Sequence, residues 1–350
     1  MAITSNTSIA QSAAPASLKP VAIWLFAMCA LVALMVLVGG ATRLTDSGLS
    51  ITEWRPVTGA VPPLSEAGWL SEFEKYKTIP EYTQVNAGMS LAEFKVIYWW
   101  EWGHRFLGRL IGVAFLVPFA AFALTGRVRG RLAWKLGGLF ILGGMQGALG
   151  WWMVASGLVD RVDVSQYRLA AHLGLAILLF AAMFWLALDL WPEEKPKGPR
   201  ALLPAALGLS LAIYAQIILG AFVAGLRAGA DFNSWPLMDG RFFPEGYFAG
   251  APRLNDLFET AAAVQFNHRI GAYLIAGAAV WFYFAARKTA LQDRATAILF
   301  VVGLQVLLGI WTVIAAAPIG LGLLHQGGAV LLLGCALYAA HGATGPKARG

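Results

Sequence analysis

The stretch Glu101-Trp-Gly-His-Arg105 places a histidine between two charged residues at the start of a long apolar segment. A histidine inside a membrane-spanning helix is costly to bury, so it generally has a partner or a function there. A related stretch, Gln265-Phe-Asn-His-Arg269, stands at the start of another apolar segment in the second half of the chain. The chain is therefore organised around two related copies, each with a histidine at the mouth of a candidate membrane span.

The composition is that of an integral membrane protein. Hydrophobic residues make up 58% of the 350 residues and charged residues only 13%, and the mean hydropathy is +0.64. A net charge of +7 is compatible with nucleic-acid binding, but the basic residues cluster in short loops between apolar runs. That distribution is typical of the cytoplasmic loops of membrane proteins and excludes nucleic acid as a partner.

Eight apolar runs are long enough to cross a membrane at roughly 20 residues per span. They cover residues 21–41, 97–125, 132–155, 168–190, 202–224, 261–286, 295–316 and 321–341. Lysine and arginine concentrate after the second, fourth, sixth and eighth runs, which predicts that both termini are cytoplasmic. Residues 1–19 lack the features of a signal or transit peptide, and we expect a disordered cytoplasmic tail there.

The rest of the chain is an internal duplication. Gln146-x-x-x-Gly-x-Trp152 returns as Gln305-x-x-x-Gly-x-Trp311, and His172 returns as His325. Gly39, Trp54, Gly59 and Pro63 match Gly220, Trp235, Gly240 and Pro244, all at one constant offset. We expect an all-α fold of two tandem four-helix bundles, residues 20–192 and 201–341. An even number of spans per copy predicts a pseudo-two-fold axis along the membrane normal.

Helix-start signals place the repeated histidines near the outer surface. Ser90-Leu-Ala-Glu93 predicts a capping box before His104, and Asp256-Leu-Phe-Glu259 is expected to play the same part before His268. His172 follows Ser165 by seven residues, and His325 follows Pro318 by seven. A further helix outside the membrane is predicted over residues 65–77.

Four of the five histidines thus fall on alternate spans at one depth. Low-spin haem takes two imidazoles on opposite faces of a planar ring, and the core of a four-helix bundle offers such a slot. His104 and His172 would form one pair, and His268 and His325 the other. The alternative is that these histidines only join helices through hydrogen bonds. His341 has no copy, so we expect it to be structural.

The two copies differ at the residue three before the histidine, which is Glu101 in the first and Gln265 in the second. A glutamate can transfer protons and a glutamine cannot, so we expect chemistry in the first half and electron transfer in the second. Alternatively, Glu101 only pairs with Arg105 one turn along the helix. Arg105 and Arg269 would either meet haem propionates or extend to the membrane surface.

The chain combines eight spans, a four-plus-four duplication, Glu-x-x-His-Arg on the second span, Asn-His-Arg on the sixth and lone histidines on the fourth and eighth. In this combination, residues 20–341 resemble haem A synthases. The resemblance implies an oxidoreductase that converts the C8 methyl of haem O to the formyl of haem A for terminal oxidases. It implies haem B on His268 and His325, and haem O near His104 and His172 with Glu101 beside the reacting methyl.

Some members of that family carry a cysteine pair in the first outer loop, whereas residues 42–96 contain no cysteine. The chain therefore resembles the proteobacterial and mitochondrial branch, and we expect a multi-pass protein of the bacterial inner membrane. The implied partners are haem O, membrane lipid, haem O synthase and oxidase assembly factors. The alternatives are a dihaem b-type cytochrome that only relays electrons, and a transporter with parallel repeats.

Overall fold

The computed structural model describes residues 17–192, 197–248 and 253–345. The regular secondary structure of these residues is helical, apart from one isolated β-bridge. Eight helices are long and apolar enough to cross a membrane. They are α1 (Lys19–Leu44), α4 (Leu91–Leu124), α5 (Gly130–Ala155), α6 (Gln166–Leu190), α7 (Leu203–Gly225), α8 (Ala261–Ala286), α9 (Gln292–Ile314) and α10 (Ile319–Gly342). The eight predicted spans and the all-α integral membrane class are confirmed. Residues 1–16 of the predicted tail lie outside the described residues.

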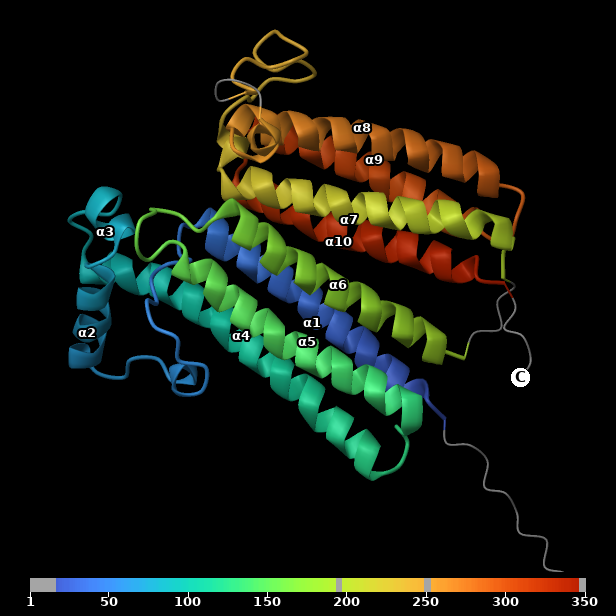
Figure 1. Cartoon of the computed structure of the whole chain (residues 1–350), viewed down its shortest axis with the longest axis horizontal. Helices are drawn as coiled ribbons and strands as arrows, with labels where there is room; N and C mark the ends of the chain where they lie inside the picture. Colours follow the sequence, from blue (N-terminus) through green and yellow to red (C-terminus); the bar gives the residue numbers. More distant parts are fainter. Residues whose placement is uncertain (1–16, 193–196, 249–252, 346–350) are drawn as a thin grey trace, which may run out of the picture.

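The eight long helices form two groups of four (Figure 1). In the first group, α1 packs on α4 and α6, and α5 packs on α4 and α6. In the second, α8 packs on α7 and α9, and α10 packs on α7 and α9. The groups meet where α1 contacts α10, α6 contacts α7, and α6 contacts α10. Exchange of the two copies converts the first of these contacts into the second, as a two-fold axis requires; the axis itself stays a prediction.

Local sequence signals explain most helix starts. Ser90 and Glu93 form the predicted capping box at α4, and Ser165 and Pro318 occupy the N-cap positions of α6 and α10. The predicted role of Asp256-Leu-Phe-Glu259 is wrong. These residues lie mainly in a short 3-10 helix (Leu254–Phe258), and α8 starts only at Ala261, because the Thr260 hydroxyl accepts the backbone N–H of Ala263.

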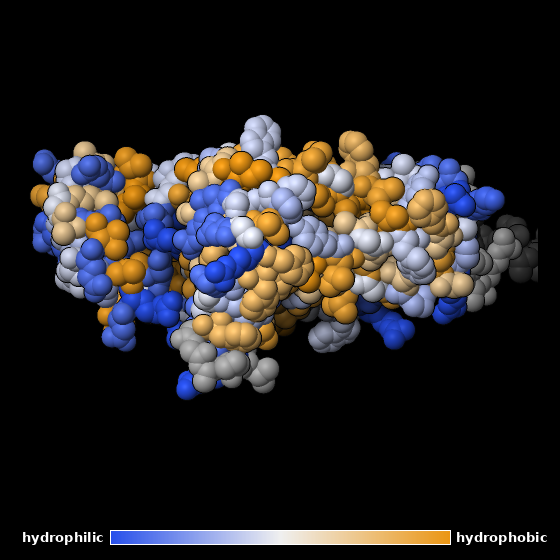
Figure 2. All heavy atoms as spheres, turned by 90° about the horizontal axis from the view of Figure 1, so that it is seen from above, coloured by the Kyte–Doolittle hydropathy of each residue, from blue (hydrophilic) through white to orange (hydrophobic). Residues whose placement is uncertain are grey.

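The loop between α1 and α4, which is predicted to lie outside the membrane and is called the first outer loop, carries two short helices, α2 (Glu66–Tyr76) and α3 (Pro80–Gln84). The predicted helix over residues 65–77 is thus confirmed. Phe73 and Tyr76 pack with Phe94 of α4 in a buried aromatic cluster, which fixes this loop over the outer end of the first bundle. Figure 2 shows hydrophobic side chains along the sides of the helices and hydrophilic ones gathered towards their ends. That distribution suits a lateral surface in contact with lipid.

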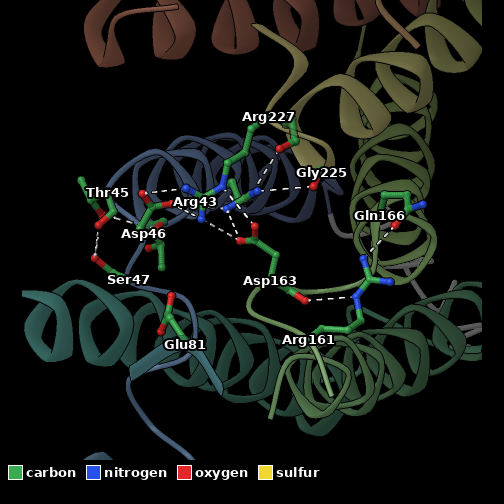
Figure 3. A network of polar contacts seen from close by, with 12 residues as sticks. Arg43, Thr45, Asp46, Ser47, Glu81, Arg161, Asp163, Gln166, Gly225 and Arg227 are labelled. Atoms are coloured by element: carbon green, nitrogen blue, oxygen red, sulfur yellow. Dashed lines mark hydrogen bonds and ion pairs between the residues drawn. The ribbon is translucent and has the colours of Figure 1, made fainter. Parts of the chain in front are cut away.

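An ion cluster joins the two halves at their outer ends (Figure 3). Asp163, in the α5–α6 loop, pairs with Arg43 at 3.0 Å and with Arg227 at 2.9 Å, and Asp46 pairs with Arg227 at 3.0 Å. Asp46 and Arg227 occupy the same position in the two copies, because they are related by the constant offset of the duplicated loops, and both have a left-handed backbone. The two equivalent residues of the duplicated loops, Asp46 and Arg227, therefore form an ion pair with each other.

Candidate functional site

The four repeated histidines lie two to a bundle, on α4 and α6 in the first half and on α8 and α10 in the second. Each packs against a glycine of the spanning helix that precedes it. The pairs are His104 with Gly39, His172 with Gly150, His268 with Gly220 and His325 with Gly309. A methyl group at these glycines would lie 2.8 to 3.3 Å from the imidazole, so it would press on the ring and shift it, most of all at Gly150. The recurrence of glycine before each histidine is thus a steric requirement.

The second pair of histidines has the spacing of a metal site. The ring centroids of His268 and His325 are 6.2 Å apart, with planes at 76°. Because a metal–imidazole bond is about 2 Å long and the ring centroid lies roughly 1 Å behind the nitrogen, an iron between two imidazoles separates the centroids by roughly 6 Å. The residues present therefore fit a haem iron bound on both faces.

Glu101 is buried and makes four hydrogen bonds. One carboxylate oxygen accepts from the Ser50 hydroxyl at 2.7 Å and from the Ile51 backbone N–H at 2.8 Å. The other accepts from Arg105 at 2.7 and 3.1 Å. The pairing with Arg105, which the spacing along the helix predicted as an alternative, is therefore present. The carboxylate is held rigidly between α4 and the first outer loop.

The second copy repeats this arrangement with an amide. Arg269 donates to the Gln265 side-chain oxygen at 2.7 Å, and the Gln265 amide nitrogen donates to the Ala228 carbonyl at 2.7 Å. The outer loop thus offers a carbonyl in the second half where Ser50 and Ile51 offer two donors in the first. Each loop has the polarity that its own glutamate or glutamine needs.

Arg105 and Arg269 both hold outer loops through backbone carbonyls. Arg105 donates to the carbonyls of Ile51 and Glu53 at 2.8 and 3.1 Å. Arg269 donates to those of Phe232 and Ser234 at 2.8 and 2.9 Å. These acceptors are again equivalent positions of the duplicated loops. In this structure the arginines position the loops, and their expected binding to haem propionates stays a prediction.

The loop above Glu101 contains a second buried acid, Glu81, which is only 3% exposed. The Tyr76 hydroxyl donates to it at 3.0 Å. The pKa of Glu81 is raised to about 8, mainly by burial; the Tyr76 hydrogen bond lowers this pKa and the nearby negative charge of Glu101 raises it. Trp54 of the same loop contacts Trp151 of α5, with ring centroids 5.4 Å apart. The outer end of the first bundle is therefore covered.

His341 lies at the opposite end of the second bundle, as expected for a structural residue. Its Nε2 atom is 3.2 Å from the carboxylate of Asp189 on α6, and the Lys197 ammonium donates to its backbone carbonyl at 3.1 Å. These contacts tie α10 to the first half.

The comparisons with known proteins agree with this geometry. Residues 22–337 match the family described as Cytochrome oxidase assembly protein. A protein named "Heme A synthase" from Parvibaculum lavamentivorans is 55% identical over 321 residues, which cover 92% of this chain and 93% of that one. One of the same name from Caulobacter vibrioides is 50% identical over 327 residues, covering 91% and 94%.

The chain belongs to the haem A synthase family. The expectation of an enzyme, an oxidoreductase, is thereby confirmed. The eight spanning helices and the bacterial members of the haem A synthase family place the chain in the inner membrane as a multi-pass protein.

The sequence analysis found the duplicated motif of Gln146 and Gln305 but missed Gln216. This glutamine donates to the backbone carbonyl of His268 at 2.7 Å. The signal was present, because Gln216 stands four residues before Gly220 as Gln146 stands before Gly150. Gln216 thus contacts His268, a predicted ligand of the haem iron.

Proposed function

We propose that the chain is a haem A synthase that oxidises the C8 methyl group of haem O to the formyl group of haem A. The observation that carries this proposal is the duplicated pair of histidines in which only the first copy adds an ionisable residue, Glu101 for Gln265. Membership of the family supports the class of reaction. The difference between the copies assigns the chemistry to the first half.

In the second half, His268 and His325 would hold haem B. The spacing of 6.2 Å between their rings supports this assignment. A b-type haem bound there supplies one-electron transfer. Gly220 and Gly309 leave the imidazoles the room that this position requires, and Gln216 holds His268 in place. No ionisable side chain stands at the position of Gln265, as suits a site that only carries electrons.

In the first half, His104 and His172 would bind the iron of the substrate, haem O. Glu101 lies one helical turn before His104, so both belong to the same part of α4. Oxidation of the methyl group releases protons, and the Glu101 carboxylate accepts a proton as a general base. Arg105, Ser50 and Ile51 orient that carboxylate through hydrogen bonds. Two successive hydroxylations of the methyl carbon, each of which needs an external two-electron oxidant and an external source of oxygen, give a geminal diol, which loses water to leave the formyl group.

Expression in a bacterium that makes haem O but no haem A tests this proposal. Haems extracted from its membranes and separated by chromatography should include haem A only when the chain is produced. A purified protein that holds haem B in both halves, in a cell that still makes no haem A, would instead identify an electron-relay cytochrome.

A further inference from the structure

Three of the four histidine sites share a glutamine, and the fourth site, that of His104, lacks it. Three of the four glycines that face a histidine are preceded by a glutamine four residues earlier, namely Gln146, Gln216 and Gln305. The glycine that faces His104 is preceded by Met35 instead. Positions four apart lie on one face of a helix. Met35 therefore stands where the other three sites have an amide.

Two of the glutamines bridge the backbone and the ring of their histidine. The Gln146 amide nitrogen donates to the His172 carbonyl at 2.9 Å and lies 3.1 Å from Nδ1 of the same residue. The Gln216 amide nitrogen donates to the His268 carbonyl at 2.7 Å and also lies 3.1 Å from Nδ1. One side chain thus fixes both the helix turn and the imidazole.

The glutamines also contain the acceptor that a ligating imidazole needs. An imidazole that binds a metal through Nε2 carries its proton on Nδ1 and donates it to a neighbouring oxygen. In this structure the amide nitrogens of Gln146 and Gln216 face Nδ1, and their side-chain oxygens are buried without a partner, so the amide group has to turn to bring its oxygen to the ring. In the third pair, the Gln305 amide nitrogen and Nδ1 of His325 are both buried without one. Each pair therefore retains hydrogen-bonding capacity at the ring.

His104 has no such neighbour. The Met35 methyl group lies 3.3 Å from where a side chain on Gly108 would begin, one turn beyond His104. A thioether has no proton to donate and is a weak acceptor. The His104 ring presents its Nε2–Cδ2 edge to Gly39, whereas His172 and His268 present the Cε1–Nδ1 edge to their glycines and His325 presents Cε1, with Nδ1 and Nε2 equally distant. Across residues 17–192, 197–248 and 253–345, no hydrogen bond reaches the ring of His104 or of His325, but His325 has the amide of Gln305 at the position that Met35 occupies for His104.

Resting on the proposed function, we propose that His104 is the one exchangeable imidazole of the four. The iron of a haem bound in the first half accepts a small external ligand in place of His104, and the iron in the second half stays closed. The physical reason is that hydrogen bonds to a ligating imidazole fix its orientation and strengthen its bond to the metal. Met35 and Gly39 supply neither effect. The three glutamines are positioning residues and Met35 is not, and the half with the glutamate is also the half with the accessible iron.

The test is a cyanide titration of the oxidised, haem-loaded protein, followed by its visible and electron paramagnetic resonance spectra. In the wild type, cyanide should bind to one of the two haems. Met35→Gln should weaken that binding about 10–100-fold, the range found when such outer partners are changed. Gln216→Met should open the second haem to cyanide by a similar factor. Met35→Leu, which adds no hydrogen bond, should match the wild type.

Equal binding of cyanide by both haems of the wild type would overturn the inference. Unchanged affinity in both Met35→Gln and Gln216→Met, with haem content retained, would overturn it as well. A protein that holds no haem in either half would contradict the proposed function together with this inference, whereas two equally closed haems would contradict this inference alone.

Discussion

Replacement of Glu101 by glutamine gives the first half the residue that the second half already has. In the second half, Gln265 meets a loop carbonyl, that of Ala228. In the first half, the same amide would face the Ser50 hydroxyl and the Ile51 N–H, both of which now donate to the carboxylate. The hydroxyl can rotate to accept, but the Ile51 N–H cannot. One buried donor would therefore lose its acceptor.

The structural cost of Glu101→Gln is therefore about 1–3 kcal/mol, the usual cost of a buried donor left without a partner. A stability of roughly 5–15 kcal/mol tolerates such a loss, so the protein should fold and insert. The chemical effect should be much larger. A positioned acid–base group contributes on the order of 10²–10⁴-fold in rate.

The assay is the haem content of membranes from a host that supplies haem O and has no other source of haem A. Glu101→Gln should retain haem B, make little haem A, and accumulate haem O or a hydroxylated intermediate. Ser50→Ala is the matched control, because it removes a donor from the same carboxylate and keeps the acid; it should lose at most a few-fold in haem A. Near-normal haem A from Glu101→Gln would show that Glu101 only holds the loop through Arg105.

The same contacts lead to three further predictions. Gly309→Ala should weaken haem B binding by roughly 1–3 kcal/mol through overpacking, because the added methyl group would lie 3.0 Å from His325. Gly303→Ala, on the same helix, is the control: a methyl group there has no neighbour within 4 Å, so haem B should bind normally. Equal haem content in the two variants would contradict this prediction. Glu81 has its pKa raised to about 8, so folding favours its protonated form and the wild-type melting temperature should fall as the pH rises from 6 to about 8. Glu81→Gln should remove most of that fall, and an unchanged pH dependence would refute the effect. A reporter active only in the periplasm should work after Glu245 and fail after Gly126; the opposite result would reverse the topology.

The membrane spans, and the correspondence of each span in the first copy to one in the second, could be predicted from the sequence. Hydrophobic length, basic loops and repeated spacing are local or periodic signals. The start of α8 could not be predicted in this way. Asp256 and Glu259 have the spacing of a cap, but Asp256 accepts the N–H of Arg253 and Glu259 accepts hydrogen bonds from Gln166 and Tyr167 of α6. Contacts with another helix decided which residue caps α8.

The placement of two repeated histidines in each bundle could be predicted from the sequence, as could the difference between Glu101 and Gln265. The partners of Glu101 could not, because Ser50 and Ile51 come from a loop whose path depends on the aromatic packing of α2 against α4. The ion cluster of Asp163 with Arg43 and Arg227 was missed for a similar reason. Its residues lie in different loops, and only the packing of the two bundles brings them together.

The central claim is that the two histidine pairs hold different haems, and a comparison of two double variants tests it most directly. The measurement is the amount and the low-spin spectrum of haem B in purified His268→Ala/His325→Ala and in His104→Ala/His172→Ala. The first should lose its haem B, and the second should keep the full b-type spectrum while making no haem A. Retention of haem B without His268 and His325, or its loss with only His104 and His172 replaced, would contradict the account.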